Sequence, residues 1–377
     1  MKVLQICSFY AVNNLYKNLF NGLKDINIES DIYIPCRPKN IPNNTEENEF
    51  FSVVYKNGDN LYEKFINILC QYEFYMKNNK IYEDLKNKIE LGKYNIIHAH
   101  SLFENGYLAY KAKKEYGIDY IVALRNTDVN GYFKNIKHLR KLGIEIMKNA
   151  KKVIFISPSY KEFVINNFVK ENEKNDLLEK FQVIPNGIDD FWIENISIEK
   201  EIKKDSNVVK LIHASRIDKN KNVETSIEIS KELRKKGIES YIKIIGDGPE
   251  KNNLMRIYKE NEYVEFIDKL NKDELINQYD SSDILIMPSK FETFGLVYPE
   301  AMSRGLPVIY TKSQGFDNYF KEGVVGYPIK YNDVNEGFNS VIKILNNYKE
   351  ISRNCIENSR RFSWEKICKE YKKIYKD

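Results

Sequence analysis

The sequence lacks long apolar runs and is poor in cysteine. No stretch approaches the roughly 18 to 20 consecutive apolar residues that span a bilayer. The apolar part of the first residues, MKVLQICSFY, is too short for a signal peptide, and no small-residue cleavage site follows it. The five cysteines form no C-x-x-C pair and have no neighbouring histidine. These absences argue against an integral membrane protein and a structural zinc site, and they predict a cytoplasmic location.

The chain also has only a small excess of positive over negative charge. The chain has 59 Lys and Arg against 54 Asp and Glu, a net charge of +5, so nucleic-acid binding has little support. A complete G-x-G-x-x-G is missing as well, which disfavours a nicotinamide-dependent dehydrogenase. The slight basic excess is compatible with a phosphate-bearing substrate or an anionic membrane surface, although ordinary solvated lysines account for most of it.

The chain of 377 residues is longer than the roughly 250 to 300 residues at which one hydrophobic core stops growing, so we expect two domains. Short apolar runs alternate with amphipathic helical stretches, which predicts parallel sheets covered on both faces. The fold class is therefore α/β, with two Rossmann-like, doubly wound domains that face each other across a cleft. We place the first domain at 1–185, a linker at 186–206 and the second domain at 207–361. An amphipathic helix over 362–376 is an ordinary packing helix or returns to the first domain.

The stretch KFETFGLVYPEA, residues 290–301, joins a predicted strand to a helix that begins near Gly295. Pro299 stands in the first turn, where its missing N–H costs nothing, and the N–H groups of such a helix start favour an anion. Glu300 lies one turn into the helix, where its carboxylate can accept two hydrogen bonds from a ribose. Glu292 precedes the turn and would face another part of the same ligand. The alternative, a favourable first-turn acid and a solvated loop carboxylate, stays open on these residues alone.

Two cations stand upstream, after the strand that precedes IHASRIDKNKN. Arg216 and Lys221 can converge on a diphosphate, Arg through its planar fork and Lys as a point charge. A solvated lysine-rich loop is the ordinary alternative. The loop IIGDGP, which contains Gly246, is by itself only a good turn.

Taken in order, R-x-x-x-x-K, G-D-G-P, V-x-F and P-S-x-x-E-x-F-G-L-x-x-x-E-A-M-x-x-G-x-P-V resemble the retaining glycosyltransferases of the GT-B fold known as family 4, or glycosyl transferases group 1. The match is closest over residues 207–327. The resemblance implies that Arg216, Lys221 and Glu292 are catalytic, because the two cations stabilise the leaving nucleotide and the carboxylate contacts the transferred sugar. It also implies a set of donor-binding residues: Gly246, Thr293, Phe294, Gly295, Leu296 and Glu300.

The first domain departs from the family pattern in two places. The loop SFYAVNN after the first strand has no glycine, whereas relatives commonly carry a Gly-Gly pair there. Arg125 stands where relatives often have a histidine, and arginine cannot serve as a general base. It would grip an anionic or hydroxyl-rich ligand with Asp128 as its partner, or the two residues brace the loop. His98 and His100 alternate on one strand face, and we predict that His100 contacts the acceptor or the sugar.

The resemblance predicts a metal-independent hexosyltransferase, and the sequence contains no D-x-D metal motif. It would transfer a sugar with retention from a nucleotide diphosphate sugar, with UDP the preferred nucleotide, to a glycan or lipid-linked acceptor in surface polysaccharide or glycoconjugate synthesis. No cofactor other than the donor is expected. A basic helical stretch over 133–152 would allow peripheral contact with the inner membrane face. The alternatives are a sugar-nucleotide epimerase or phosphorylase of similar fold, or a non-catalytic nucleotide-sugar binding protein.

Overall fold

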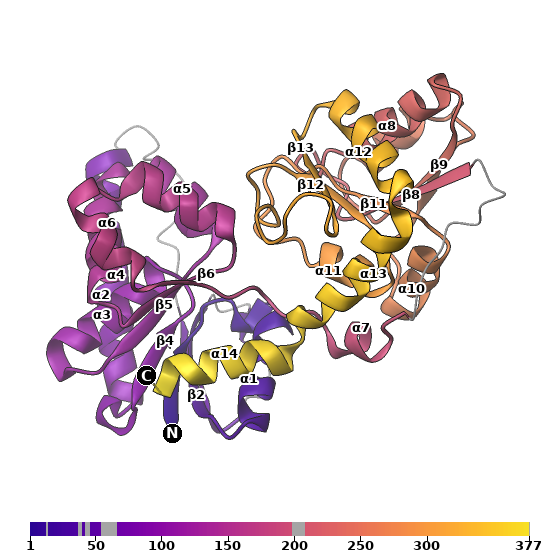
Figure 1. The fold of residues 1–377 in the computed structure, drawn as a ribbon. Helices are drawn as coiled ribbons and strands as arrows, with labels where there is room; N and C mark the ends of the chain where they lie inside the picture. The colour runs from indigo at the N-terminus through magenta and orange to yellow at the C-terminus, as the bar shows by residue number, and fades with distance from the viewer. Residues whose placement is uncertain (13, 37–39, 42–45, 54–65, 198–207, 377) are drawn as a thin grey trace. The chain divides into compact units, whose positions relative to one another are not determined.

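The computed structural model describes residues 1–377 except 13, 37–39, 42–45, 54–65, 198–207 and 377 (Figure 1). The described chain forms two compact units. Unit 1 comprises Met1–Ile156, Tyr160–Pro185 and Trp364–Asp377, and unit 2 comprises Ser157–Ser159 and Asn186–Ser363. Each unit contains one parallel sheet with helices around it. The prediction of two Rossmann-like α/β domains is confirmed.

Unit 1 is built on a sheet in the order β3-β2-β1-β4-β5-β6-β7. The order reverses between β1 and β4, and in such sheets the carboxyl ends of the strands are where ligands bind. The strands are β1 Lys2–Ile6, β2 Glu29–Cys36, β3 Glu49–Val53, β4 Ile96–Ala99, β5 Tyr120–Leu124, β6 Lys152–Phe155 and β7 Phe181–Val183. The helices are α1 Asn14–Asp25, α2 Ile66–Lys88, α3 Glu104–Tyr116, α4 Arg140–Asn149, α5 Pro158–Phe168, α6 Glu171–Leu178 and α14 Trp364–Lys376.

The C-terminal helix α14 packs against α1 within unit 1. Its buried side chains recur at helical spacing: Trp364, Ile367, Cys368, Tyr371, Ile374 and Tyr375. This stripe faces the core because one side of the helix is apolar while lysines occupy the other. The two helices approach closely at Gly22, where an added Cβ would lie 2.8 Å from the Cys368 sulfur.

Unit 2 has a six-stranded sheet in the order β10-β9-β8-β11-β12-β13. The strands are β8 Val208–Ala214, β9 Glu239–Ile245, β10 Val264–Ile267, β11 Ile284–Ile286, β12 Val308–Thr311 and β13 Gly326–Ile329. The helices are α7 Asp190–Glu194, α8 Val223–Lys235, α9 Lys251–Ile257, α10 Lys272–Asp280, α11 Val297–Ser303, α12 Val334–Asn346 and α13 Tyr348–Ser359. Among the described residues of both units, no helix is long and apolar enough to cross a membrane.

Part of the stretch predicted as a linker, 186–206, is ordered within unit 2. The Asp189 carboxylate accepts a hydrogen bond from the Phe191 N–H (3.1 Å) and so caps α7. Ile188 and Trp192 are buried in the core of unit 2. The end of the predicted linker, from residue 198 on, lies outside the described residues.

Candidate functional site

The residues predicted to bind the donor lie on three loops of unit 2. Arg216 and Lys221 follow β8, Gly246 follows β9, and the segment 292–296 lies between β11 and α11. The three strands are neighbours in the order β9-β8-β11. Because the carboxyl ends of parallel strands meet at one edge of the sheet, the three loops lie at the same edge.

Lys221 and Glu292 form an ion pair at this edge. The Lys221 ammonium lies 2.6 Å from Glu292 Oε2, and the two side chains are 21% and 11% exposed. Glu292 Oε1 accepts a further hydrogen bond from the N–H of Thr293 (3.1 Å). Lys221 and Glu292 are 71 positions apart in the sequence. The fold brings the ammonium predicted to bind phosphate into direct contact with the carboxylate predicted to contact the sugar.

Arg216 is the second cation of the cluster, and 73% of its side chain is exposed. Its Nε lies 3.8 Å from Asp218 Oδ2, a weak surface contact. Asp218 shapes the loop instead, since its Oδ1 accepts the backbone N–H groups of Asn220 (3.0 Å) and Lys221 (3.1 Å). The guanidinium therefore stays accessible to a ligand at the rim of the cluster.

Asn220 joins the two loops that carry the ion pair. Its backbone O accepts the N–H of Lys290 (2.7 Å). Its side-chain Oδ1 accepts the N–H of Phe291 (3.0 Å), and its Nδ2 donates to the Phe291 carbonyl (2.9 Å). Asn222 adds a hydrogen bond from its Nδ2 to the Pro288 carbonyl (3.1 Å). Sequence reasoning missed this link because asparagines are common in loops of this chain.

For the sugar transfer from a UDP donor that the family resemblance implies, Asn220→Ala is expected to lower kcat about tenfold, with a smaller change in the affinity for UDP. The reason is that Glu292 follows Phe291 directly, and small misplacements of a contacting group lower rates strongly. Initial rates and isothermal titration with UDP would measure the two effects separately. Asn252→Ala, an exposed asparagine on α9, is the matched control. Equal kcat in Asn220→Ala and wild type would contradict a positioning role.

Glycines permit close backbone approach at the same edge. Gly246 has a φ of 143°, and a Cβ added there would lie 1.8 Å from the Ser215 carbonyl oxygen. The N–H of Ile217 donates to the Asp247 carbonyl (2.9 Å), so the two loops are also hydrogen-bonded. Gly295 has a φ of 82°, and its Cβ would lie 2.3 Å from the Tyr298 ring. A side chain at either position would displace the loops that carry the charged residues.

Aromatic packing and a backbone hydrogen bond fix the position of the segment from Thr293 to Leu296. The Phe294 ring is 2% exposed and packs on the rings of Phe316 and Tyr319, with centroids 6.1 and 5.6 Å away. The Glu292 carbonyl accepts the N–H of Gly315 (2.8 Å). The Phe294 side chain is therefore part of the core, and only the backbone of this residue is left to contact a ligand.

Glu300 lies in the first turn of α11 and is partly exposed. Burial raises the pKa of the Glu300 carboxyl to about 7, against the opposing effect of Lys272 and with a further rise from Asp189. The Glu300 backbone carbonyl accepts a hydrogen bond from the Ser303 hydroxyl (2.7 Å), which does not involve the carboxylate. A carboxyl with this pKa is about half ionised at neutral pH, and its ionised form can accept hydrogen bonds from a ligand's hydroxyls. Since α11 has only seven residues, the site depends on loop backbone and side chains rather than on a long helix dipole.

The affinity for UDP-glucose is expected to rise as pH increases from about 5.5 through 7. This donor's diphosphate is esterified at both ends and does not titrate in that range, whereas Glu300, which faces Lys272, Asp189 and Tyr279, ionises there. Because the folded pKa lies above 4.5, ionisation opposes folding, so this group's contribution to stability falls as pH rises through 7. Titration calorimetry across this range, repeated with Glu300→Gln, would measure the slope. A slope that persists in Glu300→Gln would contradict the assignment.

In unit 1 the structure gives His100 a different place from the predicted ligand contact. His100 is fully buried, its Nε2 lies 2.9 Å from Gln5 Oε1, and its ring meets Tyr16 and Phe20 edge-on, each with centroids 5.3 Å apart. Burial lowers the pKa of His100 well below 6.5, and nearby His98 and Arg125 lower it further. His100 is a neutral core residue because aromatic side chains cover the strand face that the alternation pointed to.

Asp128 and Arg125 each hydrogen-bond to backbone groups of the segment that follows β4. Asp128 is 1% exposed, and its carboxylate accepts the backbone N–H groups of Phe103 (3.1 Å) and Arg125 (2.8 Å). Burial raises the pKa of Asp128 to about 6, although these backbone donors oppose the rise. Arg125 is 8% exposed; its Nε donates to the His100 carbonyl (3.1 Å) and its guanidinium lies 5.4 Å from the Tyr16 ring centroid.

Comparison with known proteins identifies the family. The family described as "Glycosyl transferases group 1" matches residues 194–362, and that described as "Glycosyltransferase Family 4" matches residues 12–190. The fold is that of a sucrose-phosphate synthase from Thermosynechococcus elongatus (TM-score 0.73, 17% identity, 100% of this chain and 98% of the other). This chain belongs to the family 4 glycosyltransferases of the GT-B fold.

Other glycosyltransferases align with most of this one. An uncharacterized glycosyltransferase of Methanocaldococcus jannaschii is 27% identical over 100% of this chain and 98% of its own. The UDP-Gal:alpha-D-GlcNAc-diphosphoundecaprenol alpha-1,3-galactosyltransferase of Escherichia coli is 26% identical over 83% of each chain. The solved structure of Anabaena HepE in complex with UDP has a TM-score of 0.68 at 15% identity and covers 99% of each chain.

Proposed function

We propose that this glycosyltransferase moves a hexose from a UDP-sugar to an acceptor hydroxyl, with retention of anomeric configuration and without a metal ion. The observation that carries the proposal is the cluster of Lys221, Glu292 and exposed Arg216 around a glycine-lined loop edge in unit 2. It combines two cations for a diphosphate with a carboxylate for a sugar.

Each residue has a distinct part in the proposed reaction. Lys221 and Arg216 bind the diphosphate and stabilise the negative charge that develops on it as the glycosidic bond breaks. Glu300 accepts hydrogen bonds from the ribose hydroxyls, and Glu292 accepts them from the transferred sugar. No protein nucleophile is assigned; the departing phosphate takes the proton of the attacking acceptor hydroxyl. Because two side-chain cations supply the positive charge, the reaction needs no metal ion.

The relatives support UDP as the nucleotide and a lipid-linked acceptor. UDP is bound in the Anabaena structure, and the name of the Escherichia coli enzyme specifies UDP-Gal and a diphosphoundecaprenol-linked sugar. In unit 1 the stretch 133–152 exposes Lys134, Lys137 and Lys141, which suits peripheral contact with an anionic membrane. With such an acceptor, the enzyme would act on the cytoplasmic side in the synthesis of a surface polysaccharide or glycoconjugate.

Incubation with UDP-sugars, with and without candidate acceptors, would test the reaction by ¹H NMR. The proposal expects an α-linked product from an α-configured donor, formed only when an acceptor is present. Conversion of the donor sugar into its epimer without an acceptor would identify an epimerase instead. Tight UDP binding with neither transfer to any acceptor nor slow donor hydrolysis would favour a non-catalytic binding protein.

A further inference from the structure

One face of the unit 2 sheet is polar and uncovered over part of β8, β9 and β10, whereas Ile212 and Ile245 further along the same face are buried. Lys210 on β8, Tyr241 and Lys243 on β9, and Glu265 on β10 share this face, because Lys210 pairs with Tyr241 and Glu265 pairs with Lys243 in register. Strands of parallel sheets are normally buried on both faces and read as continuous apolar runs. At Lys210, Tyr241, Lys243 and Glu265 these strands carry long polar or aromatic side chains instead, and the Tyr241 ring is 43% exposed.

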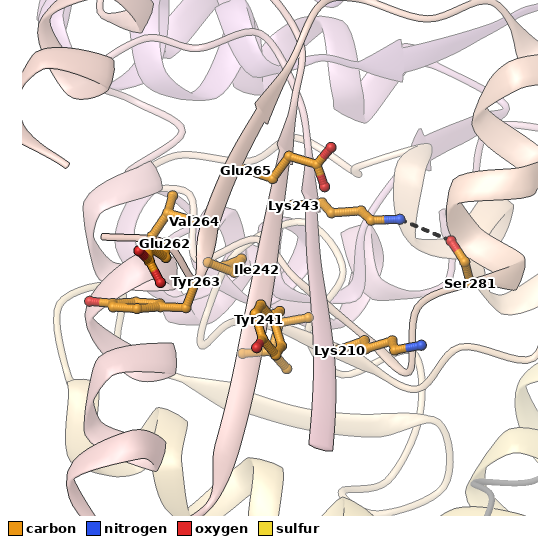
Figure 2. Close-up of a pocket in the computed structure, with 10 residues that line it drawn as sticks. Lys210, Tyr241, Ile242, Lys243, Glu262, Tyr263, Val264, Glu265 and Ser281 are labelled. Carbon is orange, nitrogen blue, oxygen red and sulfur yellow. Dashed lines mark hydrogen bonds between the residues drawn. The ribbon is translucent and has the colours of Figure 1, made fainter. Parts of the chain in front are cut away.

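The open face is hollowed into a cavity of about 490 Å³, within the roughly 300 to 1,000 Å³ of small-molecule sites. Figure 2 shows Tyr241 between Lys210 and Tyr263, with Lys243 and Glu265 further along the strands. The Lys243 ammonium donates to Ser281 Oγ (3.0 Å) and Gln278 Oε1 (2.7 Å), which holds its side chain extended. The cavity thus has an aromatic ring with charged and polar groups around it.

The charges that line the cavity cancel. Lys210 and Lys243 contribute two positive charges, and Glu262 and Glu265 contribute two negative ones. Next to the cavity, Arg234 lies over the Tyr241 and Tyr263 rings (5.7 and 5.0 Å to the centroids) and Glu239 accepts the Tyr241 hydroxyl, which adds one charge of each sign. A lining with no net charge gives no advantage to an anion such as a phosphate. The Tyr241 and Ser281 hydroxyls already donate within the protein, to Glu239 Oε1 (2.9 Å) and the Gln278 carbonyl (3.1 Å). The Lys210 ammonium and the Glu262 and Glu265 carboxylates line the same cavity, and the exposed Tyr241 ring offers an apolar surface. A neutral ligand with many hydroxyls and one apolar face can use the ammonium, the carboxylates and the ring.

We propose that this cavity binds a sugar residue of a glycan, at a site separate from the donor loops. The donor loops follow the carboxyl ends of the strands, whereas Lys210 and Tyr241 lie near their beginnings. Tyr241 on β9 and Gly246, which directly follows β9, are five residues apart, or about 16 Å of extended chain. A glycan held here remains tethered to the enzyme, which raises its effective concentration for transfer. Binding of a sugar in this cavity does not depend on the proposed reaction.

Saturation-transfer NMR on the full chain would test the site with three probes: methyl α-D-glucopyranoside, methyl α-D-galactopyranoside and N-acetylglucosamine. Saturating UDP is added to occupy the donor loops. We expect saturation of at least one probe, and a loss of affinity of at least tenfold in Tyr241→Ala. Glu265→Gln and Lys210→Ala, which change exposed side chains, should each weaken the same probe. Tyr116→Ala, an exposed tyrosine of unit 1, should bind like wild type.

UDP titration of each variant separates this proposal from the donor site. Unchanged UDP affinity in Tyr241→Ala shows that unit 2 is folded, so a lost sugar signal then supports the proposal. Three results would overturn it: no saturation of any probe, saturation that is equal in Tyr241→Ala, Glu265→Gln and wild type, or Tyr241-dependent binding of inorganic phosphate or AMP in place of sugars.

Discussion

Glu292→Gln is expected to lower the rate of sugar transfer at least about 10²-fold while UDP binding is kept or becomes severalfold tighter. Removing one preorganised group that contacts the reacting centre costs about 10²- to 10³-fold in enzymes that stabilise developing charge. The Glu292 carboxylate also forms an ion pair with the Lys221 ammonium at 2.6 Å. An amide gives up that charge interaction, so Lys221 becomes more available to the diphosphate of UDP.

Initial rates with a UDP-sugar and titration calorimetry with UDP would measure the two effects in Glu292→Gln. Glu260→Gln, which changes an exposed carboxylate of the same unit, is the control and should leave both unchanged. Transfer within twofold of wild type would remove Glu292 from the reaction. A loss of UDP affinity as large as the loss of rate would assign it to nucleotide binding instead.

Lys221→Ala is expected to weaken UDP binding by about 10- to 100-fold. A hydrogen bond to a charged group contributes about 1.5 to 3 kcal/mol, and each 1.4 kcal/mol is about a factor of ten in affinity. The substitution also leaves Glu292, whose side chain is 11% exposed, without its cation, so the melting temperature should fall by a few degrees. Arg216→Ala should weaken UDP binding similarly with no loss of stability, since 73% of that side chain is exposed.

Calorimetry with UDP and thermal unfolding of the free proteins would check both variants. The matched control is Lys219→Ala, because Lys219 is exposed on the same loop and has the same charge. If Lys219→Ala lost as much affinity as Lys221→Ala, the loop would act only through its overall charge. UDP affinity unchanged in Lys221→Ala and in Arg216→Ala would contradict the assignment of the diphosphate to these cations.

Apolar periodicity was sufficient to predict the fold of both units, because strands buried in a parallel sheet are apolar runs that alternate with amphipathic helices. The approach of Lys221 to Glu292 could be predicted only through the family motif, since these residues stand on different loops. The role of Asn220 could not be predicted from the sequence. It depends on hydrogen bonds to backbone groups of Lys290 and Phe291, and no sequence motif indicates such bonds.

The predictions for unit 1 show that the alternation of side chains along a strand does not reveal which residues cover them. It correctly placed His98 and His100 on one strand face, and their rings lie 3.9 Å apart. It could not show that Tyr16 and Phe20 of α1 cover His100, or that Tyr375 of α14 hydrogen-bonds His98 at 2.8 Å. These contacts come from segments far away in the chain, so a strand-end histidine that suggested ligand binding is a core residue.

Thermal unfolding of the full chain with UDP-, GDP-, ADP- and dTDP-sugars tests the central claim most directly, since a ligand that binds only the native state stabilises it. The account predicts that a UDP-sugar at 100 times its Kd stabilises the protein by about 2.7 kcal/mol, which raises the melting temperature by about 5 to 10 °C for a unit of this size. The shift should be much smaller in Lys221→Ala. No shift with any of the four donors, or an equal shift in Lys221→Ala, would contradict the donor site described for unit 2.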